Sequence, residues 1–213
     1  MNTKLNRKQL PLSAAALAFL PTLAFLPTLT FVPTLAFAHA GVGHSASFWH
    51  GIAHPFSGAD HLLAMLAVGL WAVQMGSRAL WVLPCAFVAL MLAGGVLGIA
   101  NIPLPYVEEG ILLSVLILGA LIAGAFRFSL AVSALVVGMF AIFHGYAHGA
   151  EVPVATGVIG YSTGFVAATA ILHAVGIAGG LLLQRLEMAN LTRFAGALIA
   201  FGGVYFGLVQ VVQ

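Results

Sequence analysis

The chain has 213 residues, of which 62% are hydrophobic and 6% charged, and its mean hydropathy is +1.12. Water-soluble domains carry about 25% charged residues, so this composition excludes such a domain. The net charge of +2 is spread over few residues, which excludes a nucleic-acid-binding surface. Cys85 is the only cysteine, so a metal site within one chain needs nitrogen and oxygen ligands.

The first forty residues follow the pattern of an export signal. Basic residues near the start precede an apolar stretch over 10–36, and overlapping small-residue cleavage patterns end at Ala38 and Ala40. We therefore expect residues 1–38 to be a signal peptide, with cleavage after 38 or after 40. The alternative is that the segment stays attached as an anchor. In either case it delivers the following chain to the outer side of the membrane.

Residues 39–56 are rich in glycine and histidine, and we expect them to form a periplasmic segment outside any span. His39, His44 and His50 are expected to be solvated there. Cleavage before His39 would leave a free amine beside its imidazole. These two nitrogens would then chelate a metal ion at the entrance.

The rest of the chain, 57–213, contains apolar segments long enough to cross about 30 Å of hydrocarbon. Six such segments lie near 57–76, 79–100, 109–126, 128–147, 156–183 and 194–212. The sequence therefore predicts an all-α integral membrane protein, a bundle of six transmembrane helices after an N-terminal signal peptide.

The charged residues of the connecting loops predict one orientation, because cytoplasmic loops collect Lys and Arg. With residue 41 outside, every arginine after the signal segment falls inside, and every acid except Glu187 falls at an outer end. The arginines are Arg78, Arg127, Arg185 and Arg193, and the outer acids are Asp60, Glu108, Glu109 and Glu151.

A polar cluster opens the first span, where an ionised group at mid-depth costs at least ~2.5–3.5 kcal/mol and usually marks a pathway. It contains His54, Asp60 and His61, with Pro55 and Gly58 between them. Pro55 and Asp60 also suit a helix N-terminus, but the histidines have no such explanation. If the helix begins at His54, the two imidazoles share one face. If Pro55 and Gly58 bend the chain, His54 folds back over the mouth.

A second cluster closes the fourth span, at the same predicted outer side. His144 and His148 are four residues apart, the spacing by which one helix face offers two imidazoles to one metal ion, and Glu151 continues that face. The two clusters together would gather three or four imidazoles and two carboxylates.

His173 stands alone within the fifth predicted span, at or beyond mid-depth. A lone intramembrane histidine serves equally well as a hydrogen-bond partner of a neighbouring helix or as a metal ligand. The sequence leaves both roles open.

Three segments resemble, in order, the motifs of the HupE/UreJ family: HPFSGADHLLAMLAVG at 54–69, FHGYAHGAE at 143–151 and GFVAATAILHAVG at 164–176. The resemblance extends from about His39 to the end of the chain. It implies a bacterial inner-membrane permease that takes up nickel or cobalt for urease or hydrogenase maturation or for cobalamin synthesis.

We therefore predict a secondary transporter and not an enzyme, with no permanently bound cofactor and with Ni2+ or Co2+ as the transported ion, Zn2+ being a further candidate. Its partners would be the lipid bilayer and the divalent ion, without nucleic acid, and a homo-oligomer is left open. The predicted ligands are His54, Asp60, His61, His144, His148 and Glu151, with His173 and His39 in supporting roles.

Two rival functions use the same residues. In a membrane-embedded zinc hydrolase, zinc on His61, His144 and His148 would activate a water, with Asp60 or Glu151 as general base. In a haem-binding electron carrier, two histidines on facing helices would be the axial ligands.

Overall fold

The computed structural model describes residues 44–152 and 157–212, and the regular structure in these ranges is helical throughout. The elements are α2 His44–Ala53, the short 3-10 helix η3 His54–Phe56, α3 Ala59–Met75, α4 Ala79–Ile99, α5 Val107–Ala123, α6 Leu130–Ala150, α7 Val158–Arg185 and α8 Ala189–Val212. The predicted signal peptide and His39 lie outside the described residues.

Four of these helices, α4, α6, α7 and α8, are long and apolar enough to cross a membrane, and a fifth span results if α2, η3 and α3 count as one bent element. The prediction of an all-α, multi-pass membrane protein is therefore confirmed. The count of six spans stays a prediction. The helices α3 and α5 have 17 residues each, which corresponds to about 26 Å at 1.5 Å per residue, slightly less than about 30 Å of hydrocarbon.

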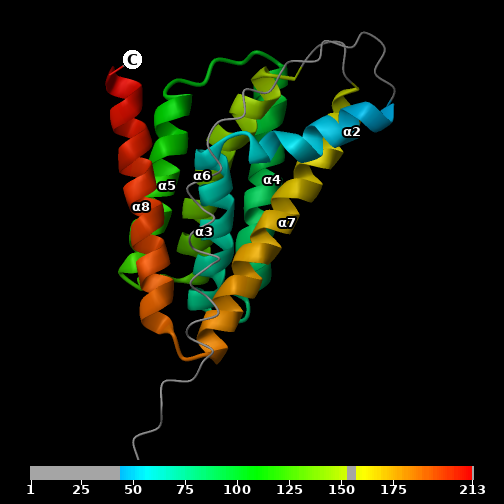
Figure 1. Cartoon of the computed structure of the whole chain (residues 1–213). Helices are drawn as coiled ribbons and strands as arrows, with labels where there is room; N and C mark the ends of the chain where they lie inside the picture. Colours follow the sequence, from blue (N-terminus) through cyan, green and yellow to red (C-terminus); the bar gives the residue numbers. More distant parts are fainter. Residues whose placement is uncertain (1–43, 153–156, 213) are drawn as a thin grey trace, which may run out of the picture. The chain divides into compact units, whose positions relative to one another are not determined.

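The helix α3 lies inside the bundle, and the other helices pack around it in pairs (Figure 1). The helix α4 runs along α6, α5 runs along α8, and α7 packs against both α3 and α2. The core between them is apolar and includes Met65, Trp71, Phe87 and Leu118. Trp71 Nε1 donates a hydrogen bond to the carbonyl of Phe126, which anchors α3 to the chain that follows α5.

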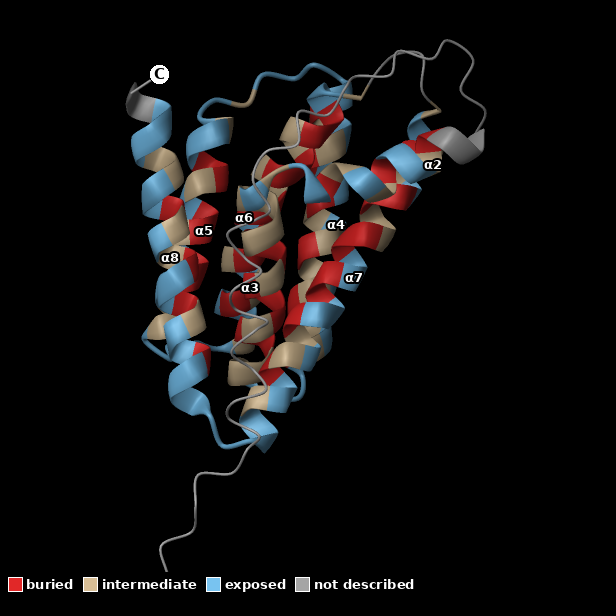
Figure 2. Ribbon diagram, in the orientation of Figure 1, coloured by how far each residue is buried: buried red, intermediate tan, exposed pale blue. Residues whose placement is uncertain are grey.

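The outward faces of the helices are exposed and yet apolar (Figure 2). Trp81 on α4, Leu135 on α6 and Phe201 on α8 expose 77%, 68% and 68% of their surfaces. Apolar side chains outside a buried core are what a lipid environment requires, because hydrocarbon rather than water covers them.

The pair α4 and α6 is held unusually close by glycine. A Cβ on Gly145 would collide with the main-chain carbonyl of Met91, and one on Gly149 would collide with that of Gly95. Such small-residue faces let helix backbones approach within a membrane. The close packing fixes the rotation of α6, and this rotation decides where the histidines of that helix point.

The part of the segment before residue 57 that the structure describes is helical: α2 lies there and crosses one end of the bundle (Figure 1). It is bent by 82° from α3. Gly51 of α2 lies against the backbone of Tyr161, and Gly164 lies against that of Phe48, so α2 is packed on α7. His50, on α2, is exposed as expected.

Candidate metal centre

The chain direction changes at the start of α3, and this change places His54. Pro55 lies in the first turn of η3, and the hydroxyl of Ser57 donates to the carbonyl of His54 at 2.6 Å. Gly58 then has extended backbone, with φ −107° and ψ 117°, before α3 begins. Of the two arrangements left open by the sequence, the structure has the second one: His54 folds back and does not share a helix face with His61.

The last two turns of α6 supply a pair of buried imidazoles. His144 is 0% and His148 is 6% exposed, and the two side chains lie on the same side of the helix, one turn apart. Gly145 and Gly149, each of which directly follows one of these histidines, pack on α4. The histidine face is thereby directed to the start of α3, where the ring centroid of His61 lies 4.7 Å from that of His144 and 4.3 Å from that of His148.

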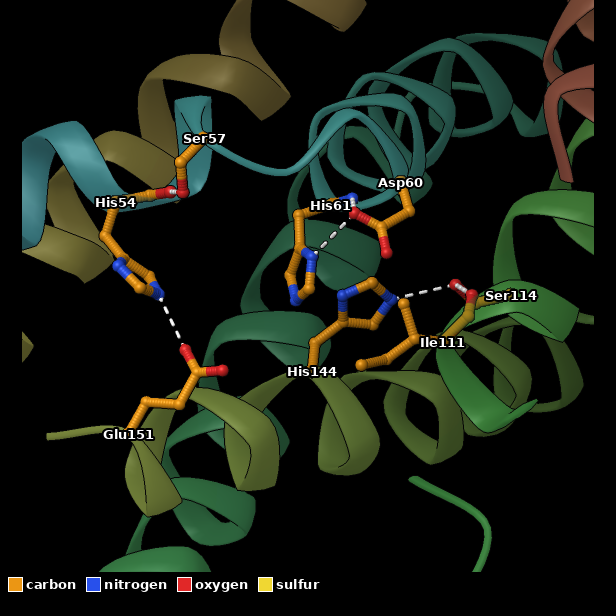
Figure 3. A network of polar contacts seen from close by, with 8 residues as sticks. All are labelled: His54, Ser57, Asp60, His61, Ile111, Ser114, His144 and Glu151. Carbon is orange, nitrogen blue, oxygen red and sulfur yellow. Dashed lines mark hydrogen bonds and ion pairs between the residues drawn. The ribbon is translucent and has the colours of Figure 1, made fainter. Parts of the chain in front are cut away.

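Three side chains bring possible ligand atoms together: His54, His148 and Glu151. One such atom from each lies within 4.8 Å of the other two. Nε2 of His54 is 3.2 Å from Oε2 of Glu151 (Figure 3), and the centroids of the two imidazole rings are 4.6 Å apart. Glu151 is the C-cap residue of α6 and is 63% exposed, so this triad opens to the end of the bundle.

Aromatic side chains of α7 form one wall of the triad. The ring centroid of Phe165 is 4.1 Å from that of His148, and the centroid of Tyr161 is 5.6 Å from that of His54. A cavity of about 190 Å³ lies beside His148, between α4, α6 and α7. His148, Tyr161 and Phe165 all line this cavity, so the imidazole of His148 borders open space beside the aromatic side chains of α7.

His61 and His144 lie next to the triad and hold other partners. Oδ1 of Asp60 accepts the backbone N–H of His61 at 2.8 Å and lies 3.0 Å from its Nδ1. Nε2 of His144 is 2.8 Å from the hydroxyl of Ser114 on α5. The predicted pair His144 and His148 is thus divided: His148 joins the triad, whereas His144 faces His61 (Figure 3). Asp60 contacts His61 and is not a member of the triad.

His173 lies deeper, on α7, and is 1% exposed. Phe87 of α4 lies between it and the outer histidines, with ring centroids 5.0 Å from His173 and 5.7 Å from His144. The carbonyl of His173 packs against Gly69 of α3. Successive ring contacts therefore connect five imidazoles along the bundle, in the order His54, His148, His61, His144 and His173, and Phe87 makes the connection between the last two.

Many nitrogens of these rings have no hydrogen-bond partner among the described residues. They are Nε2 of His61, Nδ1 of His144, both nitrogens of His148 and both of His173. An unpaired buried polar atom costs about 1–3 kcal/mol, so these nitrogens indicate a further partner, an ion or a water, at this place in the bundle. Imidazoles with one or two carboxylates suit nickel, copper and zinc.

Sequence reasoning missed Ser114, Phe87 and Tyr161, which contact the predicted histidines. Ser114 is a single hydroxyl in an apolar span, and Phe87 is one of 15 phenylalanines. Neither residue type is unusual in a membrane helix. Only the helix register of α5 relative to α6 reveals Ser114, and that register depends on tertiary packing.

Comparison with known proteins gives two matches. The HupE / UreJ protein family matches residues 27–206. Protein HupE of Rhizobium leguminosarum bv. viciae is 48% identical over 169 residues, which cover 78% of this chain and 87% of that protein. The family match begins inside the segment predicted to be an export signal. No solved structure matches.

Proposed function

The chain belongs to the HupE/UreJ family, and from this membership and the geometry of its histidines we propose that it is a secondary transporter of nickel or cobalt ions. The observation that carries the proposal is the triad of His54, His148 and Glu151, whose ligand atoms lie within 4.8 Å of one another at one end of a bundle of apolar helices. The exposed carboxylate of Glu151 lets an ion enter from water and partly compensates its charge, and the half-buried imidazole of His54 and the buried one of His148 add nitrogen ligands.

The ion would pass from the triad into the bundle along the remaining imidazoles. His61 contacts His148 and His144, and Phe87 connects the ring of His144 with that of His173. Conduction requires sites that bind well enough to admit the ion and weakly enough to release it. A series of imidazoles, each with few ligands of its own, meets both requirements.

The orientation that we propose follows the arginines. The triad and the N-terminus of α3 are at one end of the helices. At the opposite end, Arg78 and Arg127 follow α3 and α5, and Arg185 is the last residue of α7. In a bacterial inner membrane the arginine-bearing end would be cytoplasmic and the triad would face the periplasm. Transport is then uptake, and the ion would supply urease or hydrogenase maturation or cobalamin synthesis.

The energy source is not nucleotide hydrolysis by this chain. Its sequence contains no G-x-x-x-x-G-K-[ST] motif, so it lacks the loop that binds nucleotide phosphates in that class of pump. A metal ion displaces a proton from any imidazole that carries one. Transport by this chain is therefore passive or secondary, with protons as the natural coupling ion.

The proposal is tested by metal uptake into proteoliposomes that contain the purified chain, with nickel, cobalt and zinc measured separately. We expect uptake of nickel or cobalt well above that of empty vesicles, and loss of that uptake in a His144→Ala, His148→Ala double variant. A His50→Ala variant, which changes an exposed histidine of α2, should transport at the parental rate. Equal uptake of all three ions, uptake no greater than in empty vesicles, or a double variant that inserts normally and transports at the parental rate would refute the proposal.

The same preparation separates the rival functions. A zinc hydrolase would retain stoichiometric zinc through purification with a chelator and would hydrolyse a substrate, and a haem carrier would be coloured. A colourless protein that loses its metal to the chelator and transports nickel or cobalt meets neither description.

A further inference from the structure

Ser114 lies on α5, is 0% exposed, and makes two short polar contacts. Its hydroxyl donates to the carbonyl of Ile111, one turn earlier, at 2.6 Å, and lies 2.8 Å from Nε2 of His144 (Figure 3). A serine hydroxyl has one proton but two acceptor lone pairs. The oxygen-to-oxygen distance of 2.6 Å requires that proton between Ser114 and Ile111.

The hydrogen bond between Ser114 and His144 must therefore run the other way. With its proton engaged, the hydroxyl of Ser114 accepts, and Nε2 of His144 donates. A neutral imidazole carries one N–H, so Nδ1 of His144 is then the nitrogen with the free lone pair. This Nδ1 is buried and has no partner in the described part of the chain.

The same reasoning applies to His61, with the two nitrogens exchanged. An ionised carboxylate only accepts, so Nδ1 of His61 donates to Oδ1 of Asp60, and Nε2 keeps the lone pair. Nε2 of His61 is also buried and without a partner among the described residues. The two rings are perpendicular, at 90°, with centroids 4.7 Å apart, and Figure 3 shows Nδ1 of His144 on the side of its ring that faces His61.

We propose that Ser114 is a positioning residue that holds His144 as the Nε2–H tautomer. Nδ1 of His144 and Nε2 of His61 then form a two-nitrogen inner station for the ion, next to His148 of the triad. The station rests on the proposed transport of a divalent metal ion. Histidines that bind metals nearly always donate their other N–H to an acceptor, which fixes the ring and its lone pair. Asp60 and Ser114 are these acceptors for His61 and His144. A station with two nitrogens binds more weakly than the triad, which permits release.

The first test is the tautomer of His144 in the full chain without metal. With 15N-labelled histidine in lipid nanodiscs, long-range 15N–1H spectra distinguish the two tautomers, and the His144 signals are assigned from their absence in His144→Gln. We expect protonated Nε2 and unprotonated Nδ1 in the parental chain. A protonated Nδ1 would overturn the proposal, even if the chain transports nickel. The expected tautomer in a chain that transports no metal would leave the assignment of Ser114 standing and would instead refute the transport function.

The second test is Ser114→Ala, with Ser133→Ala as the matched control. Ser133 is also 0% exposed, and its hydroxyl contacts Met75 and no histidine. We expect Ser114→Ala to change the 15N shifts of His144 and to lower nickel uptake at least tenfold, the smallest loss that is usual for such acceptors, while binding of nickel at the triad stays within about twofold. Ser133→Ala should leave the 15N shifts of His144, the nickel uptake and the nickel binding at the triad unchanged. Unchanged His144 shifts and parental uptake in Ser114→Ala would overturn the proposal, and if that variant does not insert, the parental tautomer decides.

Discussion

Oε2 of Glu151 lies 3.2 Å from Nε2 of His54, although the two residues are 97 positions apart in the chain. One residue ends α6, and the other lies in the break before α3. The contact therefore exists only if the chain turns back at η3 and α6 reaches the same end of the bundle. It joins the two motifs that the sequence presents separately.

The charge of Glu151 should contribute to metal affinity. We expect Glu151→Gln to lower the affinity for nickel at least tenfold, which corresponds to about 1.4 kcal/mol, because the amide keeps the shape and a hydrogen bond to His54 but removes the charge that compensates the ion. Glu187→Gln, at the opposite end of the bundle, is the matched control and should bind as the parent does. Equilibrium dialysis of nickel against the purified variants measures both. Equal affinities would remove Glu151 from the site.

His148 is the buried member of the triad and should be indispensable. Replacing it with Ala removes a ligand and leaves a residue with high helix propensity, so the chain should still fold. We expect nickel affinity to fall at least tenfold in His148→Ala and to stay parental in His50→Ala. The same dialysis measures this, with thermal unfolding as the control for folding. Parental affinity in a well-folded His148→Ala would show that the ion binds elsewhere.

The sequence was sufficient for much of this arrangement. Apolar segments predicted helices close to those found, and the spacing of His144 and His148 predicted their common face, because both depend on local periodicity. The helix α2 was not predicted because 44–53 is rich in small and polar residues. It is held by close packing on α7, where Gly51 of α2 and Gly164 of α7 each lie against the backbone of the other helix. The division of the histidines between the triad and Ser114 was not predictable, since it depends on the register between α5 and α6.

Gly145, which lies between the two histidines of α6, should be required for stability. A Cβ at Gly145 would overlap the backbone of Met91, which cannot yield as a side chain does. We expect Gly145→Ala to destabilise the protein by about 1–3 kcal/mol. Gly179 has no neighbour within 4 Å of an added Cβ, so Gly179→Ala should be neutral or stabilise by up to about 1 kcal/mol. Thermal or denaturant unfolding in detergent measures the pair. A Gly145→Ala variant as stable as Gly179→Ala would show that α4 and α6 are not packed through this face.

The orientation can be tested with single cysteines in a Cys85→Ser background. Ser77→Cys lies beside Arg78, Leu186→Cys lies beside Arg185, and Ile102→Cys lies between α4 and α5 at the end that carries the triad. In intact cells a membrane-impermeant maleimide should label only Ile102→Cys, because the arginine-bearing loops face the cytoplasm. All three should react after detergent solubilisation. Labelling of Ser77→Cys and Leu186→Cys alone would reverse the orientation.

His173 should separate binding from conduction. Neither of its ring nitrogens has a hydrogen-bond partner among the described residues, and its ring centroid lies 5.0 Å from that of Phe87, whose ring also contacts His144. The structure therefore offers no helix-to-helix hydrogen bond that would explain a buried imidazole at this position.

We expect His173→Ala to bind nickel at the triad within about twofold of the parent, because the outer ligands are untouched, and to lose at least tenfold in uptake into proteoliposomes, because the ion has no ligand beyond Phe87. Thr169→Ala is the matched control. Thr169 lies one turn earlier on α7, is 0% exposed and contacts Met91 rather than a histidine, so its replacement should leave uptake within about twofold of the parent. If His173→Ala transported at the parental rate and showed only a loss of about 0.6 kcal/mol in stability, the usual size for a helix-to-helix hydrogen bond, His173 would be a packing residue. The path of the ion would then have to leave the bundle before it reaches Phe87.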